Sequence, residues 1–403
     1  MSVLEGKRIV LGVSGGIAAY KAIDLASKLV QAQAIVEVIL TRSATEFVTA
    51  LSFAAITKRS VHSDVFEPWT DVSKGHITLA DEAQAMIVAP ATANVIARLA
   101  NGMADDMLTV THLSAIPRGI PFVIAPAMEH HMFHHPATQK NVEELRSRGA
   151  WIVGPEHGRL ASGATGTGRL SSVEQIIGTL EAALGAQGPL AGRHVVVTAG
   201  ASREAVDPIR VLTNRSTGKM GYALARAAIQ AGARVTLITA PTNLPSVVGA
   251  EMIAIESALS LLDAVQTHAI GADVLIMAAA VADYRPTTVA EQKIKKSDDD
   301  LSIALTRNPD ILATVMTPGT LRVGFAAETE RHEEYALGKL ERKQLDLIVA
   351  NDARQAMASD ENAVTLYFSD GRRETIGQAA KADVATELIA RIGTLLLQNV
   401  MHR

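Results

Sequence analysis

The chain has 403 residues, of which 48% are apolar, with a formal net charge of −4 and no cysteine. This composition is typical of a globular protein long enough for two domains, and it excludes disulfides, thiolate zinc sites and a cysteine nucleophile. A charge so close to zero gives no reason to expect nucleic acid or a membrane surface as a partner, and with neither a signal sequence nor an apolar run of about 18 residues we expect a cytoplasmic protein.

Two segments are alike, and each predicts a parallel α/β sheet. The first runs from an apolar strand at residues 9–13 through a glycine loop and a helix to a strand at 35–40. The second runs from residues 195–200 through a longer loop and a helix to a strand at 234–238. Because helices between apolar strands impose parallel pairing, we predict two doubly wound domains. Glycine and proline in residues 185–192 indicate the boundary between them.

The first glycine loop, residues 12–16, leads into the start of a helix. Free N–H groups at such a start can hold a phosphate. Ser14 stands where G-x-G-x-x-G requires its second glycine, so a standard NAD site is disfavoured. Thr41 and Ser43 follow the next strand and could add hydroxyl donors. A tight turn without a ligand is the alternative.

Two further buried strands, residues 86–89 and 122–125, end in polar segments. After the first, Thr92 and Asn94 are good helix caps and could equally bind a heterocycle. After the second come four histidines with spacings of four, which suit a metal on one helix face. Prolines bracket this segment and no H-E-x-x-H motif appears, so we disfavour a metal site. His76 alone would more often be structural than catalytic.

Two glycine-containing segments suggest ligand binding without matching a known fingerprint. Residues 159–169 have the composition of a mobile flap over a site, although a plain surface loop is the alternative. Residues 214–221 superficially resemble a phosphate-binding loop. Thr213 stands where the first glycine belongs, and Met220 where Ser or Thr must bind Mg²⁺. A nucleotide in the second half must therefore be held elsewhere.

The stretch from Val274 to Lys296 is the best candidate for that nucleotide. An apolar strand at residues 274–277 runs into three alanines, where a ligand can approach the backbone, and then into Asp283. Open α/β sheets bind their ligands at this end of a strand. The lysines at 293, 295 and 296 supply cations for phosphate oxygens. An ordinary strand with a solvated basic loop explains the same residues.

Three later features bear on the same half of the chain. Residues 308–311 predict a turn into a helix, with proline near its first position. Phe325, at the end of a strand, offers a stacking surface. Lys339 and Lys343 are spaced for one helix face, which is usually a solvated face.

Together these motifs resemble the bifunctional phosphopantothenoylcysteine decarboxylase/phosphopantothenate–cysteine ligase family of bacterial coenzyme A synthesis, over essentially the whole chain. They are SGGIAAYK, the His76 segment, PATAN, PAM-x-x-M, the glycine flap, NRSTGKMG, AAVADY, KIKK, NPDI, GFAAET and ANDA. The resemblance implies a flavodoxin-like, FMN-binding decarboxylase domain at residues 1–188 and a Rossmann-like, CTP-dependent ligase domain at residues 189–403. It also implies a homo-oligomer in which trimeric flavoprotein domains are joined through dimeric ligase domains.

For the decarboxylase, the resemblance implies that FMN oxidises the cysteine moiety to a thioaldehyde, so that loss of CO₂ leaves an enethiolate, to which the hydride then returns. His76 would be the base, and Ser162 occupies the position of the proton donor. Residues that would hold the substrate are Glu129 and Met132. Residues that would hold FMN are Ser14, Gly15, Gly16, Thr41, Ser43, Thr92, Ala93 and Asn94.

For the ligase, the resemblance implies that CTP activates the carboxylate of 4′-phosphopantothenate as an acyl-cytidylate with loss of pyrophosphate. Lys293 would act on the transition-state charge, and Asn214 on the acyl-cytidylate as cysteine attacks. Residues that would hold CTP are Met277, Ala278, Ala279, Asp283, Lys293, Pro309, Asp310, Ile311, Leu312, Phe325, Lys339 and Lys343. Mg²⁺ is implied with the phosphates, and its protein ligands are unknown.

Two residues depart from the best-known members, which carry Cys where Ser162 stands and Asn where Glu129 stands. A thiol titrates near about pH 8.5 and a hydroxyl is a far weaker acid, so Ser162 should relay a proton but not donate well alone. An ionised Glu129 would repel the substrate carboxylate, so we predict that it is protonated in the complex or points elsewhere. The alternative function is an active ligase with an FMN-binding scaffold impaired in the reductive step. A short-chain NAD-dependent oxidoreductase is disfavoured by both failed glycine fingerprints.

Overall fold

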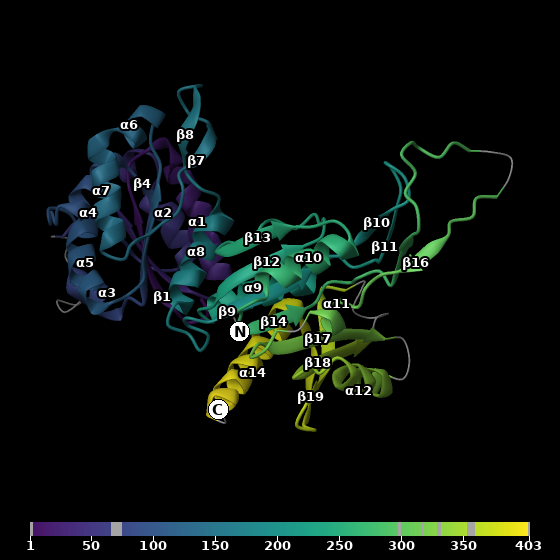
Figure 1. The fold of residues 1–403 in the computed structure, drawn as a ribbon. Coiled ribbons are helices and arrows are strands. Elements are labelled where there is room, and N and C mark those ends of the chain that lie inside the picture. Colours follow the sequence, from purple (N-terminus) through teal and green to yellow (C-terminus); the bar gives the residue numbers. More distant parts are fainter. Residues whose placement is uncertain are drawn as a thin grey trace. The chain divides into compact units, whose positions relative to one another are not determined.

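The computed structural model describes residues 3–65, 75–296, 300–315, 317–328, 332–352 and 359–401. The chain forms two compact units, Met1–Gly185 and Ala186–Arg403 (Figure 1). Thr329 and Ala353, which end the GFAAET and ANDA motifs, lie outside the described residues. None of the described helices is long and apolar enough to cross a membrane.

The first unit is a parallel sheet with helices on both faces. Its strands lie in the order β3-β2-β1-β4-β5-β6, and without the two-residue edge strand β3 this is the flavodoxin order. The predicted doubly wound, flavodoxin-like fold is therefore confirmed. The strands are β1 (Arg8–Val13), β2 (Ile35–Leu40), β3 (Val61–His62), β4 (Ala85–Ala91), β5 (Phe122–Pro126) and β6 (Trp151–Ile152), with a separate hairpin of β7 (Glu156–Arg159) and β8 (Thr165–Arg169). The helices are η1 (Ile17–Tyr20), α1 (Lys21–Gln31), η2 (Ala44–Glu46), α2 (Ala50–Thr57), α3 (His76–Glu82), α4 (Ala93–Ala100), α5 (Met107–Ala115), η3 (Ile116–Arg118), α6 (His130–His134), α7 (Pro136–Ser147) and α8 (Val173–Gly185).

Alternate residues of β1 pack into the two helix layers. Ile9 and Leu11 lie in a core cluster with residues of α1 and α8. Val10 lies in a second cluster with residues of α4, α5 and α7. The strand is therefore buried on both faces, which explains its unbroken apolar sequence. Its carboxyl end, with those of β4 and β5, opens between the two layers.

Glu37 forms a buried ionic cluster on β2. Its side chain is 6% exposed and accepts hydrogen bonds from Arg8 Nη1 at 2.6 Å and Arg59 Nε at 2.7 Å. Burial alone raises the pKa of Glu37, but hydrogen bonds from His62 and Arg59 and the charge of both arginines outweigh it and lower the pKa to about 2. The carboxylate stays ionised well below neutral pH.

We expect this cluster to make the first unit sensitive to acid. A carboxyl whose pKa falls from 4.5 to about 2 on folding stabilises the fold fully above pH 4.5, and that contribution is lost as the pH falls to about 2. Its size at neutral pH is on the order of 3 kcal/mol. Glu37→Gln should therefore unfold at lower urea concentration at neutral pH and lose the acid dependence. Glu82→Gln, which removes an exposed partner of Arg8, is the control. An unchanged acid profile in Glu37→Gln would contradict this.

The second unit is a mixed sheet of order β13-β12-β9-β14-β17-β18-β19-β20. Its first six strands are parallel in the Rossmann order, which confirms the predicted fold. The last two are antiparallel, an addition not predicted from the sequence. These strands are β9 (His194–Ala199), β12 (Arg234–Thr239), β13 (Ala250–Ala254), β14 (Val274–Met277), β17 (Leu321–Glu328), β18 (Leu347–Asp352), β19 (Glu361–Phe368) and β20 (Arg373–Ala380). The helices are α9 (Lys219–Gln230), α10 (Ala258–His268), α11 (Ile311–Thr314), α12 (His332–Arg342) and α14 (Lys381–Met401).

A thin arm extends from the sheet of the second unit (Figure 1). It consists of two antiparallel ladders, β10 (Arg203–Ala205) with β11 (Val211–Thr213) and β15 (Tyr284–Pro286) with β16 (Leu305–Arg307), and the segments between them. Large apolar side chains are exposed along it at Ile209, Val211, Tyr284, Val289, Leu301 and Leu305. Exposed apolar side chains gathered on one element are typical of a surface that meets another chain.

Candidate active sites

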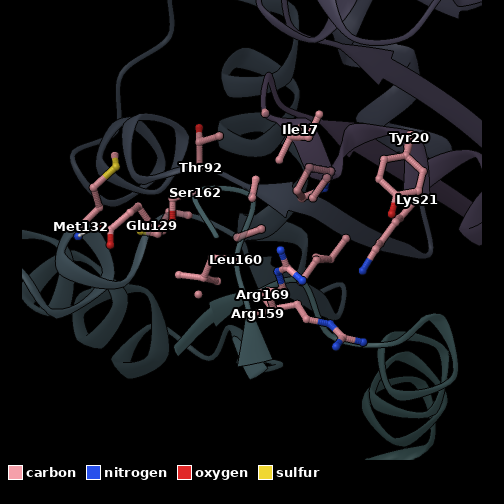
Figure 2. A pocket seen from close by; sticks show the side chains of 18 residues that line it. Ile17, Tyr20, Lys21, Thr92, Glu129, Met132, Arg159, Leu160, Ser162 and Arg169 are labelled. Atoms are coloured by element: carbon pink, nitrogen blue, oxygen red, sulfur yellow. Dashed lines mark hydrogen bonds between the residues drawn. The ribbon is translucent and has the colours of Figure 1, made fainter. Parts of the chain in front are cut away.

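A cavity of about 700 Å³ lies at the carboxyl ends of β1, β4 and β5 in the first unit. Its wall comes from the loop after β1, the start of α4, the segment before α6 and the β7–β8 hairpin (Figure 2). In this view Thr92, Ser162, Glu129 and Met132 gather at one end and Tyr20 and Lys21 lie at the other. An open α/β sheet binds its ligands at this place.

Some of the predicted flavin residues line the cavity, and the others hold the loops that form its wall. Gly16 and Thr92 line the cavity, whereas Ser14, Gly15, Thr41, Ser43, Ala93 and Asn94 do not. Ser14 is fully buried; its hydroxyl donates to Pro90 O at 2.7 Å and accepts from Thr92 N at 3.0 Å. It therefore fixes the start of α4 and does not face the cavity.

Gly15 and Thr41 also hold the loops behind the cavity wall. A Cβ on Gly15 would lie 2.5 Å from the backbone of Ser43, so only glycine allows these two loops to meet. Thr41 Oγ1 accepts a hydrogen bond from Ala44 N at 3.2 Å, which closes the turn after β2. The glycine loop is thus shaped by close packing, and its Gly16 end is open to a ligand.

Glu129 and Met132 both line the cavity, on the segment that starts α6. The Glu129 carboxylate caps this helix and accepts hydrogen bonds from His131 N at 2.7 Å and Met132 N at 3.4 Å. Burial raises the pKa of Glu129, but these amide hydrogens outweigh it and hold the pKa below its usual range. The side chain is therefore ionised and hydrogen-bonded to the start of the helix; its state in the substrate complex stays a prediction.

The predicted flap is the β7–β8 hairpin, and its tip carries Ser162 into the cavity wall. Its glycines allow close packing: a Cβ on Gly168 would lie 2.1 Å from Met128 O. Thr167 N also donates to His130 Nδ1 at 3.0 Å, so the hairpin is tied to the segment before α6. Ser162 is exposed, and no described residue accepts or donates a hydrogen bond at its hydroxyl.

His76 is the first residue of α3, half-buried, and it does not line this cavity. The four histidines around α6 lie close together, with the rings of His130 and His134 4.4 Å apart. Within the described parts of the chain, no three His, Asp or Glu side chains come together as metal ligands. His130 is engaged with the hairpin, as described above.

Three cations in the cavity wall were not predicted. Lys21, Arg159 and Arg169 line it, and Figure 2 shows the two arginines between its ends. Arg169 lies 3.8 Å from Glu156. The available signal was their place in the quoted motifs, at the end of SGGIAAYK and at both ends of the glycine flap. Cations that share a cavity wall with the start of a helix suit phosphate groups.

A second cavity, of about 230 Å³, lies at the carboxyl ends of β14 and β17 in the second unit. The predicted residues that line it are Met277, Ala279, Asp283, Pro309, Asp310, Ile311, Leu312, Phe325 and Lys343. Asp310 caps α11, and its carboxylate lies 3.0 Å from Lys343 Nζ. Asn308, which was not predicted, also lines the cavity and donates from Nδ2 to Ala282 O at 2.8 Å.

Four predicted ligase residues lie outside this cavity wall. Ala278 sits between two lining neighbours, and Lys339 is half-buried on α12. Asn214 and Lys293 are exposed, at the end of β11 and beyond β15 on the arm. The structure thus brings together nine of the twelve predicted nucleotide residues, and it places both predicted catalytic residues outside the cavity wall.

Arg322 supports the second cavity and was not predicted. It is buried on β17 and donates from Nη1 to Lys343 O at 3.0 Å and from Nη2 to Leu312 O. Burial lowers the pKa of its guanidinium. Because Leu312 and Lys343 are wall residues, one buried arginine joins two sides of the cavity. A charged residue inside an apolar strand gave no sign of this role.

Comparison with known proteins covers both units. Residues 2–185 match the family described as Flavoprotein, and residues 190–396 match the DNA/pantothenate metabolism flavoprotein C-terminal domain. The coenzyme A biosynthesis bifunctional protein CoaBC of Bacillus subtilis is 46% identical over 98% of this chain and 99% of its own. That of Vibrio vulnificus is 44% identical over 98% of this chain and 100% of its own.

A solved C-terminal domain of a coenzyme A biosynthesis bifunctional protein CoaBC is 40% identical and covers 53% of this chain and 100% of its own, with a TM-score of 0.46. The two family matches follow one another in the order of the two units. The chain therefore belongs to the family of bifunctional coenzyme A biosynthesis enzymes, in which a flavoprotein phosphopantothenoylcysteine decarboxylase is joined to a phosphopantothenate–cysteine ligase.

Proposed function

We propose that residues 1–188 form the FMN-dependent decarboxylase and residues 189–403 the CTP-dependent ligase, each with its own cavity as active site. Cysteine is joined to 4′-phosphopantothenate in the second cavity, and the product is decarboxylated to 4′-phosphopantetheine in the first. The observation that carries the proposal is that both cavities open at the carboxyl ends of parallel strands and are lined by the motif residues. The expected place in the cytoplasm stays a prediction.

The first cavity fits a flavin with a phosphate. Its closely packed glycine loop leaves Gly16 open to the cavity, and Lys21, Arg159 and Arg169 supply positive charge. The substrate carboxylate has no adjacent electron sink, and bound FMN would supply one for the loss of CO₂. Thr92 lines the wall as a flavin residue and Met132 as a substrate residue, and Ser162 at the hairpin tip relays the proton to the product. Glu129 caps α6, so that its carboxylate is engaged by helix amides.

The second cavity fits the nucleotide part of CTP. Met277 and Ala279 form a small-residue surface, Phe325 offers a ring for stacking and Lys343 a cation for phosphate. A volume of about 230 Å³ is smaller than a whole nucleoside triphosphate, so the phosphates extend out of it. Of its two carboxylates, Asp310 is paired with Lys343. Mg²⁺ would therefore be held mainly by the phosphates, as this ion often is.

We propose dimeric ligase domains and trimeric flavoprotein domains. The exposed apolar side chains of the arm support a dimer contact, since they have no core of their own to pack against. In the first unit, Ile17 and Tyr20 are exposed in the cavity wall. Ile77 and Leu113 are exposed on the packed pair α3 and α5 that carries His76. Two different apolar patches on one domain suit a head-to-tail ring.

One experiment tests the whole proposal. The full-length protein is incubated with CTP, Mg²⁺, 4′-phosphopantothenate and cysteine, and products are followed by mass. We expect pyrophosphate, CMP, CO₂ and 4′-phosphopantetheine. An end product two hydrogens short, the unreduced enethiol, would support the alternative of an impaired reductive step, which the whole-chain similarity does not favour. Absence of both pyrophosphate and CO₂ would contradict the proposal.

We expect Ser162→Cys to speed the final protonation. The Ser162 hydroxyl has no described partner to activate it, whereas a thiol titrates near about pH 8.5 and is the stronger acid. A well-placed general acid contributes on the order of a hundredfold, so the ratio of reduced to unreduced product should rise by up to that factor. Ala161→Cys places the same thiol one residue away in the cavity wall and is the control. An equal gain in both variants, or in neither, would contradict a proton-donor position at 162.

A further inference from the structure

The backbone around Lys293 has little structure of its own. Residues 287–296 contain no helix or strand, and the Lys293 side chain is exposed. A lysine on such a segment takes its position from the few contacts that hold the neighbouring backbone. Two of these come from one loop of the arm, residues 206–210 between β10 and β11. Val206 O accepts from Ala290 N at 3.1 Å, three residues before Lys293.

The second contact is a clamp on Ile294, the residue after Lys293. Asp207 Oδ2 accepts a hydrogen bond from Ile294 N at 3.1 Å, and Arg210 Nη2 donates to Ile294 O. Asp207 and Arg210 are themselves paired, with Arg210 Nε 3.0 Å from Asp207 Oδ2. Both backbone polar groups of Ile294 are therefore held by one ion pair.

The Asp207 carboxylate is buried and fixed by several hydrogen bonds. Its side chain is 0% exposed, and Oδ1 accepts from Ile209 N and Arg210 N, each at 2.8 Å. Burial raises the pKa of Asp207, but the amide hydrogens of Ile209, Arg210 and Ile294 and the Arg210 charge outweigh it and lower the pKa. A carboxylate with three amide donors and one cation stays ionised and rigid.

We propose that Asp207 is a positioning residue for Lys293, and that it acts by fixing the backbone of Ile294 so that the lysine meets the charge developed when CTP is attacked. The inference rests on the proposed role of Lys293. Asp207 does not line the CTP cavity, so its effect falls on the chemical step and not on nucleotide binding. A displacement of about 1 Å can cost on the order of a hundredfold in rate.

A purely structural role is the competing explanation, since Oδ1 also closes the turn at Ile209 and Arg210. Asp207→Asn separates the two. The asparagine oxygen can still accept from both turn amides, but its NH₂ group cannot accept from Ile294 N, so the turn is kept and the clamp is broken. Glu204→Gln is the matched control, because Glu204 is a buried acid on β10 that instead accepts from Ala258 N at 3.0 Å.

The test measures pyrophosphate release by the full-length protein with CTP, Mg²⁺ and 4′-phosphopantothenate. We expect Asp207→Asn to lower kcat by about a hundredfold with the KM for CTP within about twofold, and Glu204→Gln to match the wild type. In a Lys293→Gln background, Asp207→Asn should cause no further loss, because two residues acting through one group are not additive.

Three results would overturn the inference. They are a silent Asp207→Asn, a full additional loss in the Lys293→Gln background, and an equal effect of Glu204→Gln. A wild-type protein that releases no pyrophosphate would instead contradict the proposed ligase function itself. A silent Lys293→Gln would contradict the proposed role of Lys293 and, with it, the positioning role of Asp207.

Discussion

Lys293→Gln is expected to lower pyrophosphate release by about a thousandfold while the KM for CTP stays within about twofold. Removal of one group that stabilises developing charge typically costs on the order of a hundred- to a thousandfold in kcat. The nucleotide cavity is lined by residues of β14, β17 and α11, by the segments 279–283 and 308–310 and by Lys343; Lys293 is not among them. Its loss should therefore affect the transition state and leave the ground-state complex intact.

The measurement is pyrophosphate release at saturating CTP, with CTP binding followed separately by calorimetry. Glu291→Gln is the control, since Glu291 is an exposed charged residue on the same segment, two positions away. Flavin content and CO₂ release from supplied 4′-phosphopantothenoylcysteine should be unchanged in both variants. A Lys293→Gln protein with normal kcat, or one that has lost CTP binding, would contradict the assignment.

The nucleotide cavity was largely predictable from the sequence. Met277 ends an apolar strand, Asp283 lies in the segment after it and Phe325 lies on the neighbouring strand, and parallel strands bring their carboxyl ends to one edge of a sheet. The arm was not predictable, because its four strands are only three residues long and carry no long apolar run. Asp207 was missed because its partner Ile294 is 87 positions away in the chain.

In the first unit, the fold was predicted well and the direction of its polar side chains was not. Ser14 and Thr41 stand beside a glycine loop, where a hydroxyl suggests ligand binding, yet both bind backbone groups of neighbouring turns. Glu129 stands at a position expected to hold a substrate carboxylate, whereas in the structure its own carboxylate accepts hydrogen bonds from neighbouring helix amides. A residue type indicates which chemistry is available; the local backbone decides whether a ligand or a neighbouring amide receives it.

His76 gives the prediction with the largest expected effect. His76→Asn should lower CO₂ release by about a thousandfold, as expected for the loss of a general base. The residue does not line the cavity of its own chain, and it begins α3, the helix that carries exposed Ile77 and packs on α5. If the proposed trimer is a head-to-tail ring in which the α3 face of one copy meets the cavity side of the next, His76 would serve a neighbouring copy, and this is what we expect.

Mixed oligomers test this directly. His76→Asn keeps the cavity and loses the base. Gly16→Phe keeps the base and fills the cavity, since Gly16 lines it and a Cβ there would already lie 3.6 Å from Thr92 Cγ2. Each variant alone should release almost no CO₂. The two variants are co-expressed with different tags and purified through both. Every mixed ring contains one site whose intact cavity faces an intact His76, so each mixed ring should regain about one third of the wild-type rate, whereas unmixed rings joined through the ligase domains stay inactive. If mixed rings are as inactive as rings of either variant alone, His76 of a neighbouring copy does not complete the site.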